Sequence, residues 1–184
     1  MPRTIEFDSD TVLSAAMHEF RRHGYAGASI KSLERATGLS SGSLYNSFGD
    51  KDELFVKALA HYNNTVVRKR IKEHLEGKPP ADGIRSLFLS LLREPDGCLL
   101  TNSAVEFGAG ESVARAGVQE GLSLLENAFR AALDRLEPNS AHMPVKLLAL
   151  YQGILVLIRF GRPKRQIGEL INSEINLILG EASD

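Results

Sequence analysis

The chain has 184 residues, of which 43% are hydrophobic and 24% charged, and its formal net charge of −1 gives no sign of nucleic-acid binding. No apolar run approaches the roughly 20 residues of a membrane-spanning helix, and the first ten residues lack a signal pattern, so we expect a cytoplasmic protein with no membrane partner. Cys98 is the single cysteine, which excludes an internal disulfide and fits a reducing compartment.

The first predicted helix begins after Asp8 or Asp10 and runs to about His23. Its apolar residues recur at helical spacing and form one stripe: Val12, Leu13, Ala16, Met17 and Phe20. The segment from Gly24 to Gly27 is expected to end this helix.

Residues 29–48 predict two short helices joined by a tight turn. Ile30 and Leu33 start one apolar edge, and Leu44 and Phe48 form another, four residues apart. Gly38 interrupts the pattern where the chain must reverse, a position that favours a residue tolerating positive φ. The pattern is that of a helix-turn-helix motif.

The second helix of this motif has a polar face that could reach base edges or phosphates. Ser40 or Ser41 can cap the helix by accepting a hydrogen bond from its first free N–H groups. The exposed positions are then Ser43, Tyr45, Asn46 and Ser47.

Asp50 is positioned to cap a fourth helix that starts beside the motif and leaves it. Its stripe is Leu54, Phe55, Ala58, Leu59, Tyr62 and Val66. The basic run 68–70 is interpreted as a solvated face in preference to a phosphate clamp. Neither proline of Gly77-Lys78-Pro79-Pro80 can continue a helix, so this segment is the effective boundary. We expect a DNA-binding unit of residues 1–55 and a helical unit of residues 56–184.

The second unit is expected to hold five further helices, at about 81–92, 98–107, 112–136, 144–160 and 167–179. Gly117 and Gly121 lie four residues apart, so a neighbouring helix could approach closely there. The segment 144–160 is apolar on nearly every side, which requires either a central position or cover by a second subunit. The fold class is therefore all-α, with about nine helices.

Several of these residues resemble the amino-terminal domain of TetR-family transcriptional regulators, over about residues 8 to 60. They are Ala15-Ala16, Phe20, His23-Gly24-Tyr25 and the run from Leu44 to Phe55. The segment Gly97 to Phe107 resembles the carboxy-terminal domain of many such regulators. The chain departs from the family at Ser41, where a lysine is common, and at Asn46-Ser47, which replace a common His or Tyr pair.

The resemblance implies a dimeric repressor that binds a palindromic double-stranded DNA operator and is released by a small organic effector. The expected DNA-binding residues are Ser29, Ser40, Ser41, Ser43, Tyr45, Asn46 and Lys51. The expected effector-binding residues are Phe88, Cys98, Asn102, Glu106, Phe129, Tyr151 and Arg159. The homodimer interface is expected to use Gly153, Leu157, Leu170, Ile171, Ile175 and Ile178. Glu106, if buried, should meet Arg159, Arg115 or the polar end of a ligand.

Two alternatives remain open at the level of sequence. Cys98 at a helix start could form a reactive thiolate that senses oxidants or electrophiles, or it could be an inert packing residue. The chain could also be an all-helical binding protein or an enzyme without sequence-specific DNA binding. The G-x-S-x-G pattern of Gly38 to Gly42 lies between helices instead of after a strand, and the five histidines lack metal-ligand spacing. We therefore expect no catalytic site, no cofactor and no metal.

Overall fold

The computed structural model describes residues 7–136 and 142–180, and within these ranges all regular secondary structure is helical. The elements are α1 (Ser9–Gly27), α2 (Ile30–Thr37), α3 (Ser41–Phe48), α4 (Lys51–Tyr62), the π-helix η1 (Asn63–Val67), α5 (Arg68–Leu75), α6 (Pro80–Ser90), the 3₁₀-helix η2 (Leu91–Arg93), α7 (Leu99–Phe107), α8 (Arg115–Leu133), α9 (Met143–Arg159) and α10 (Lys164–Leu179). The chain keeps helical dihedral angles from α4 through η1 into α5, so these three elements form one rod. The predicted all-α class is confirmed.

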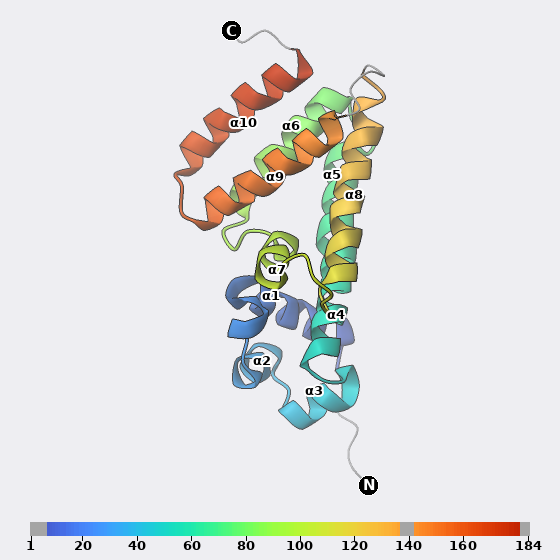
Figure 1. The fold of residues 1–184 in the computed structure, drawn as a ribbon, viewed down its shortest axis with the longest axis vertical. Coiled ribbons are helices and arrows are strands. Elements are labelled where there is room, and N and C mark those ends of the chain that lie inside the picture. Colours follow the sequence, from blue (N-terminus) through green and yellow to red (C-terminus); the bar gives the residue numbers. More distant parts are fainter. Residues whose placement is uncertain (1–6, 137–141, 181–184) are drawn as a thin grey trace.

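The rod runs along one side of the molecule, as Figure 1 shows. α1, α2, α3 and the start of α4 form one end of the molecule, which we call the head. α8 runs beside η1 and α5, while α6, α9 and α10 cover the far end. α7 lies between α1 and α8 and contacts both. It therefore joins the head to the rest of the molecule.

Local sequence signals fix where the helices of the head begin and end. Four side chains act as N-caps, as the pattern predicts for three of them: Asp8, Ser29, Ser40 and Asp50 accept hydrogen bonds from backbone amides two or three residues later. Gly38 ends α2 with a φ of 72°, the left-handed conformation expected at that turn.

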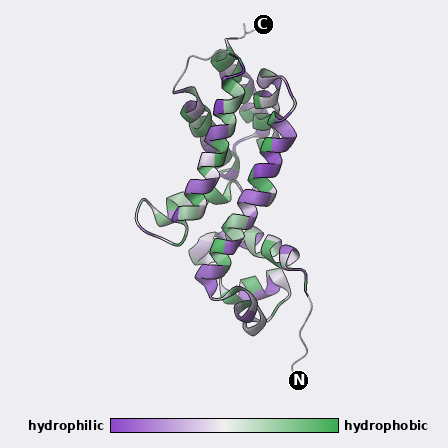
Figure 2. Ribbon diagram, turned by 90° about the vertical axis from the view of Figure 1, so that its right-hand side faces the viewer, coloured by the Kyte–Doolittle hydropathy of each residue, from purple (hydrophilic) through white to green (hydrophobic). Residues whose placement is uncertain are grey.

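The core is continuous from the head to the far end, because each helix turns an apolar stripe inward. Figure 2 shows how hydrophilic and hydrophobic residues alternate along the helices. α9 buries Leu147, Tyr151 and Ile158 but leaves apolar side chains of its opposite face in the open. The sequence segment that looked apolar all round is thus covered on one side only. No helix of the described residues is long and apolar enough to span a membrane.

The π-helix η1 was not predicted, and it shifts the buried stripe by one residue along the sequence. The expected stripe ends on Val66, but Val66 is only half-buried and Val67 is buried instead. Asn63 is buried at the start of η1, and its Nδ2 donates to the Gly117 carbonyl oxygen at 2.9 Å. A Cβ placed on Gly121 would overlap the Asn63 side chain, so the predicted close approach at the α8 glycines is confirmed.

Two further expectations differ from the structure. The helix expected over 112–136 begins at Arg115 and ends at Leu133, and the break expected at 138–140 lies outside the described residues. Arg70 is not part of a solvated face, since its guanidinium is buried against Glu94 and the Tyr151 hydroxyl.

Candidate functional site

The second helix of the motif, α3, presents its polar face to solvent. Leu44 and Phe48 are buried and hold α3 against the head. Asn46 is exposed, and the side chain of Tyr45, 36% exposed, stands beside it. A short helix with an open polar face of this kind can enter the major groove of DNA.

The serines expected to bind DNA also shape the motif. Ser29 Oγ accepts a hydrogen bond from Ser32 N at 3.1 Å, and Ser40 Oγ accepts one from Ser43 N at 3.3 Å. Ser41 N donates to Glu34 Oε1 at 2.6 Å, which ties the start of α3 to α2. Hydroxyls at two helix N-termini therefore lie where a phosphate oxygen would be favoured.

Lys51 lies in the first turn of α4, with its ammonium group over the ring of Tyr25. Its Nζ is 4.4 Å from the centre of the Tyr25 ring, within the range of a cation–π contact. The Tyr25 hydroxyl donates a hydrogen bond to Asp52, which raises the pKa of Tyr25 to about 12. The sequence singled out Lys51 but gave no sign of this support.

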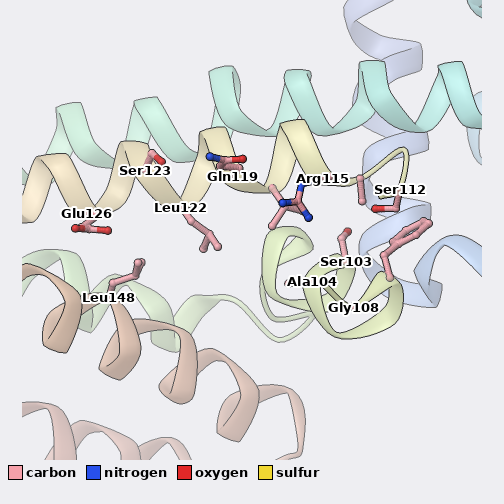
Figure 3. A pocket seen from close by; sticks show the side chains of 13 residues that line it. Ser103, Ala104, Gly108, Ser112, Arg115, Gln119, Leu122, Ser123, Glu126 and Leu148 are labelled. Atoms are coloured by element: carbon pink, nitrogen blue, oxygen red, sulfur yellow. The ribbon is translucent and has the colours of Figure 1, made fainter. Parts of the chain in front are cut away.

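A pocket of about 360 Å³ opens between α7, α8 and α9. Arg115 and Ser112 lie toward one end of it, and Glu126 lies near Leu148 at the other (Figure 3). Most of the wall between them is apolar. The lining residues are Ser103, Ala104, Phe107, Gly108, Ser112, Ala114, Arg115, Val118, Gln119, Leu122, Ser123, Glu126 and Leu148. A mainly apolar cavity with a few polar groups is the usual form of a small-molecule site.

The residues expected to bind an effector lie elsewhere. Phe88, Phe129 and Tyr151 pack on one another with ring centres 5.8 to 6.1 Å apart, in the buried core beneath α6 and α8. Cys98 is buried as well, and the Tyr62 hydroxyl donates a hydrogen bond to its sulfur at 3.5 Å. Burial and this thiol raise the pKa of Tyr62 well above its ordinary value.

The three polar residues of that set bind the end of α1. Asn102 Nδ2 and Arg159 Nη1 both donate to the Arg21 carbonyl oxygen, at 3.1 and 2.8 Å. Glu106 accepts hydrogen bonds from the amides of Tyr25 and Ala26 at 2.8 and 2.7 Å. Glu106 is exposed, so the condition under which it was expected to meet an arginine or a ligand is not met, and it binds two amides beside the kink at Gly24 instead.

The side chains expected at a dimer interface are divided between two environments. Ile171, Ile175 and Ile178 face the chain's own core, and Leu157 and Leu170 are half-buried. Gly153 is exposed, with open space where a Cβ would be. The large apolar side chains exposed on α9, on its C-cap and on α10 are Val145, Val156, Phe160 and Leu177.

Sequence reasoning missed a buried polar cluster between the head and the far end. Glu94 receives hydrogen bonds from Arg21 of α1 and Arg70 of α5, and Arg21 Nε also donates to the Gly97 carbonyl oxygen at 2.9 Å. Nothing in the local sequence around Glu94 indicates these partners. Within the described residues no three His, Cys, Asp or Glu side chains are grouped to hold a metal ion.

Known proteins resemble this chain in sequence and in fold. The family described as "Bacterial regulatory proteins, tetR family" matches residues 12–58. The HTH-type transcriptional regulator YezE of Bacillus subtilis is 30% identical over 164 residues, which cover 82% of this chain and 83% of that protein. The HTH-type transcriptional repressor AcnR of Corynebacterium efficiens is 28% identical over 146 residues, covering 76% and 73%.

A solved structure extends the likeness to nearly the whole chain. The TetR-family regulator CifR, as a cysteine mutant complexed with 26-base-pair operator DNA, superposes with a TM-score of 0.83 at 26% identity. The match covers 95% of this chain and 98% of that one. The helix-turn-helix motif, the fold and these relatives show that the chain belongs to the TetR family of bacterial transcriptional regulators.

Proposed function

We propose that the protein is a dimeric repressor that binds a palindromic operator through α3 and is released from it by a small-molecule effector. The observation that carries the DNA half is the open polar face of α3, held by Leu44 and Phe48 and flanked by the capped N-termini of α2 and α4. Relatives named as repressors support the direction of control. Residues 1–55 form the DNA-binding unit in this proposal, residues 56–184 serve dimerisation and effector binding, and the protein acts in the cytoplasm.

In the operator complex each α3 would lie in a major groove. Tyr45 and Asn46 would face base edges together with Ser43. Ser29, Ser40, Ser41 and Lys51 would contact phosphates, where helix N-termini favour negative charge. Two-fold symmetry of the dimer then requires a palindrome whose half-sites are separated by about one helical turn or a multiple of it.

Selection of binding sites from random double-stranded DNA tests the DNA half. The full-length wild type should enrich a palindromic sequence, and the binding should weaken as salt is raised. A variant with Tyr45→Ala, Asn46→Ala and Lys51→Ala keeps the buried face of α3 and should enrich nothing. Failure of the wild type to enrich any sequence would favour the alternative of an all-helical binding protein or enzyme.

The pocket between α7, α8 and α9 supports the effector half. Its mostly apolar wall suits a small, largely apolar organic molecule, and Arg115 and Glu126 offer one polar group at each end. Screening such molecules against the protein–operator complex should identify compounds that release DNA. In Leu148→Trp the indole fills the pocket, so added compound should cause no further change in operator binding, while the wild type and Val105→Ala should respond alike to the compound.

Cys98 provides the alternative means of control. If oxidants or electrophiles release DNA from the wild type but not from Cys98→Ser, the thiol is the sensor and the pocket is not. Release by neither treatment would remove the effector half of the proposal and leave a DNA-binding protein.

A further inference from the structure

Tyr25 lies where the head meets α7, and α7 holds its backbone. α1 breaks at Gly24, which has a φ of 75°, so the amides of Tyr25 and Ala26 lose the helical partners they would otherwise have. The carboxylate of Glu106 accepts both hydrogen bonds, at 2.8 and 2.7 Å. A Cβ on Gly24 would come within 2.9 Å of Glu106 Oε2, so this contact requires glycine both for its dihedral angle and for space.

The next residue of α7, Phe107, contacts the ring of the same tyrosine. The ring centres of Phe107 and Tyr25 are 5.2 Å apart, and Phe55 of α4 lies 5.6 Å from Phe107. Phe107 also lines the pocket between α7, α8 and α9. One side chain is thus shared by the pocket wall and the aromatic cluster of the head.

Tyr25 contacts the first turn of α4 on its other side. Lys51 Nζ lies over the ring at 4.4 Å, and the Tyr25 hydroxyl donates to Asp52. Lys51 is the cation proposed to bind an operator phosphate. A displacement of Tyr25 would therefore change the position of that cation.

We propose that Tyr25 carries the state of the pocket to the DNA-binding surface, with Glu106 and Phe107 holding it from α7 by its backbone and its ring. This inference rests on the proposed function and names the route of its regulation. Pocket residues and head-binding residues are neighbours on α7: Ser103, Ala104 and Phe107 line the pocket, and Asn102 and Glu106 bind α1. Because hydrogen-bonded helical turns move together, a ligand that shifts Phe107 also shifts Glu106.

Amide hydrogen exchange on the full-length protein tests the backbone contact without DNA or ligand. Glu106→Gln replaces one carboxylate oxygen by an NH₂ group, so one of the two amides loses its acceptor. Exchange at the amide that loses its acceptor should become about tenfold faster or more, and exchange at the other should rise less because its acceptor loses only its charge. Glu73→Gln, a matched change at an exposed glutamate of α5, should leave exchange at both amides unchanged. Unchanged exchange in Glu106→Gln would overturn the contact.

A double-mutant cycle tests the route, with the pocket filled by a side chain in place of a ligand. Leu122→Trp fills the pocket from α8, and Ala104→Leu fills it independently from α7. Each should speed exchange at Tyr25 and lower affinity for the selected operator about tenfold. In a Tyr25→Leu background the same fillings should change operator affinity by less than about twofold, because the ring that contacts Lys51 is gone.

The outcomes separate this inference from the proposed function. The route is overturned if the effects of pocket filling and of Tyr25→Leu on operator affinity are additive. It is also overturned if the fillings leave amide exchange at Tyr25 unchanged, even when operator binding is established. If no operator can be selected, the proposed function fails, while the exchange measurements still decide whether the pocket and Tyr25 are coupled.

Discussion

Arg70 shows how a single residue can escape a prediction made from its neighbours. It stands in a basic run, which usually indicates a solvated face, and Arg68 and Lys69 are indeed exposed. Arg70, however, donates to Glu94 and to the Tyr151 hydroxyl, the latter at 2.9 Å. Its partners lie in α9 and in the loop after η2, far from Arg70 in the sequence, so the local sequence carries no trace of them.

Replacing Arg70 should therefore be costly. Arg70→Met keeps the length of the side chain but leaves the buried Tyr151 hydroxyl without its donor and Glu94 with one arginine instead of two. We expect a loss of about 3 kcal/mol in the free energy of unfolding, measured by urea denaturation. Arg68→Met, at an exposed position two residues earlier, should change it by less than about 0.5 kcal/mol. Equal effects of the two changes would contradict the buried role of Arg70.

The effect of replacing Tyr45 should be confined to DNA binding. Tyr45→Ala removes an exposed side chain from α3 and should lower affinity for the selected operator by about 1–3 kcal/mol, the range of a good specific contact. Circular dichroism and thermal unfolding should match the wild type. Full operator affinity in a folded Tyr45→Ala protein would remove Tyr45 from the proposed contacts.

Ionisation of Tyr25 should lower the stability of the folded protein at alkaline pH. Its hydrogen bond to Asp52 raises its pKa from the ordinary 10.0 to about 12, so the folded protein keeps this proton longer than the unfolded chain does. The stabilisation is complete below about pH 10 and is lost as the pH rises through about 12. Between these values the urea midpoint of the wild type should fall more steeply than that of Tyr25→Phe. If the urea midpoints of the two proteins fall in parallel as the pH rises, the Tyr25 hydroxyl does not keep its hydrogen bond to Asp52 in solution.

At the scale of elements, the start and end signals of the head could be predicted, while the joints between helices could not. Asp8, Ser40 and Asp50 cap their helices as expected, because an N-cap involves residues two or three positions apart. Glu106 binds amides of α1 about 80 positions earlier, an interaction created by the kink at Gly24. The family resemblance pointed to a pocket in the second unit, but its lining residues depend on how α7, α8 and α9 pack.

The crossing of α8 over η1 depends on a glycine. In Gly121→Ala the added methyl group would overlap the Asn63 side chain and the Leu100 methyl groups, so we expect a loss of about 1–3 kcal/mol in the free energy of unfolding. Gly168→Ala provides the matched control, because the nearest atom to its new methyl group would be Leu92 Cδ1 at 3.9 Å. Alanine at position 168 should be neutral or stabilising by up to about 1 kcal/mol. Similar losses at both positions would refute the close approach.

At the scale of the whole molecule, the exposed apolar side chains of α9 call for a partner surface. Val145, Val156 and Phe160 are 52%, 50% and 83% exposed, and together with Gly153 they recur at helical spacing along one face. Leu177 of α10 is 70% exposed. The proposed homodimer would cover this face with its symmetric copy.

Sedimentation should therefore show a dimer at micromolar concentration. Val156→Glu places a charge in the middle of the exposed face of α9, so it should produce monomers and weaken operator binding. Val105→Glu adds the same charge at a more exposed position on α7 and should leave the dimer intact. A wild type that sediments as a monomer yet binds a palindrome tightly would contradict the proposed assembly.

The π-helix in the middle of the rod has a consequence for how the two ends of the molecule are aligned. The π-helical turn of η1 contains about one residue more than an α-helical turn. The extra residue therefore widens this turn and does not rotate α5 relative to α4. A chain one residue shorter within 63–67 could therefore close into an uninterrupted α-helix with the head and the far end still in phase. The same deletion elsewhere in the rod would turn one end against the other by about 100°, the angle between successive residues of an α-helix. Shortening by one residue should thus be tolerated at one place in this rod, and that place lies between the head and the far end of the molecule.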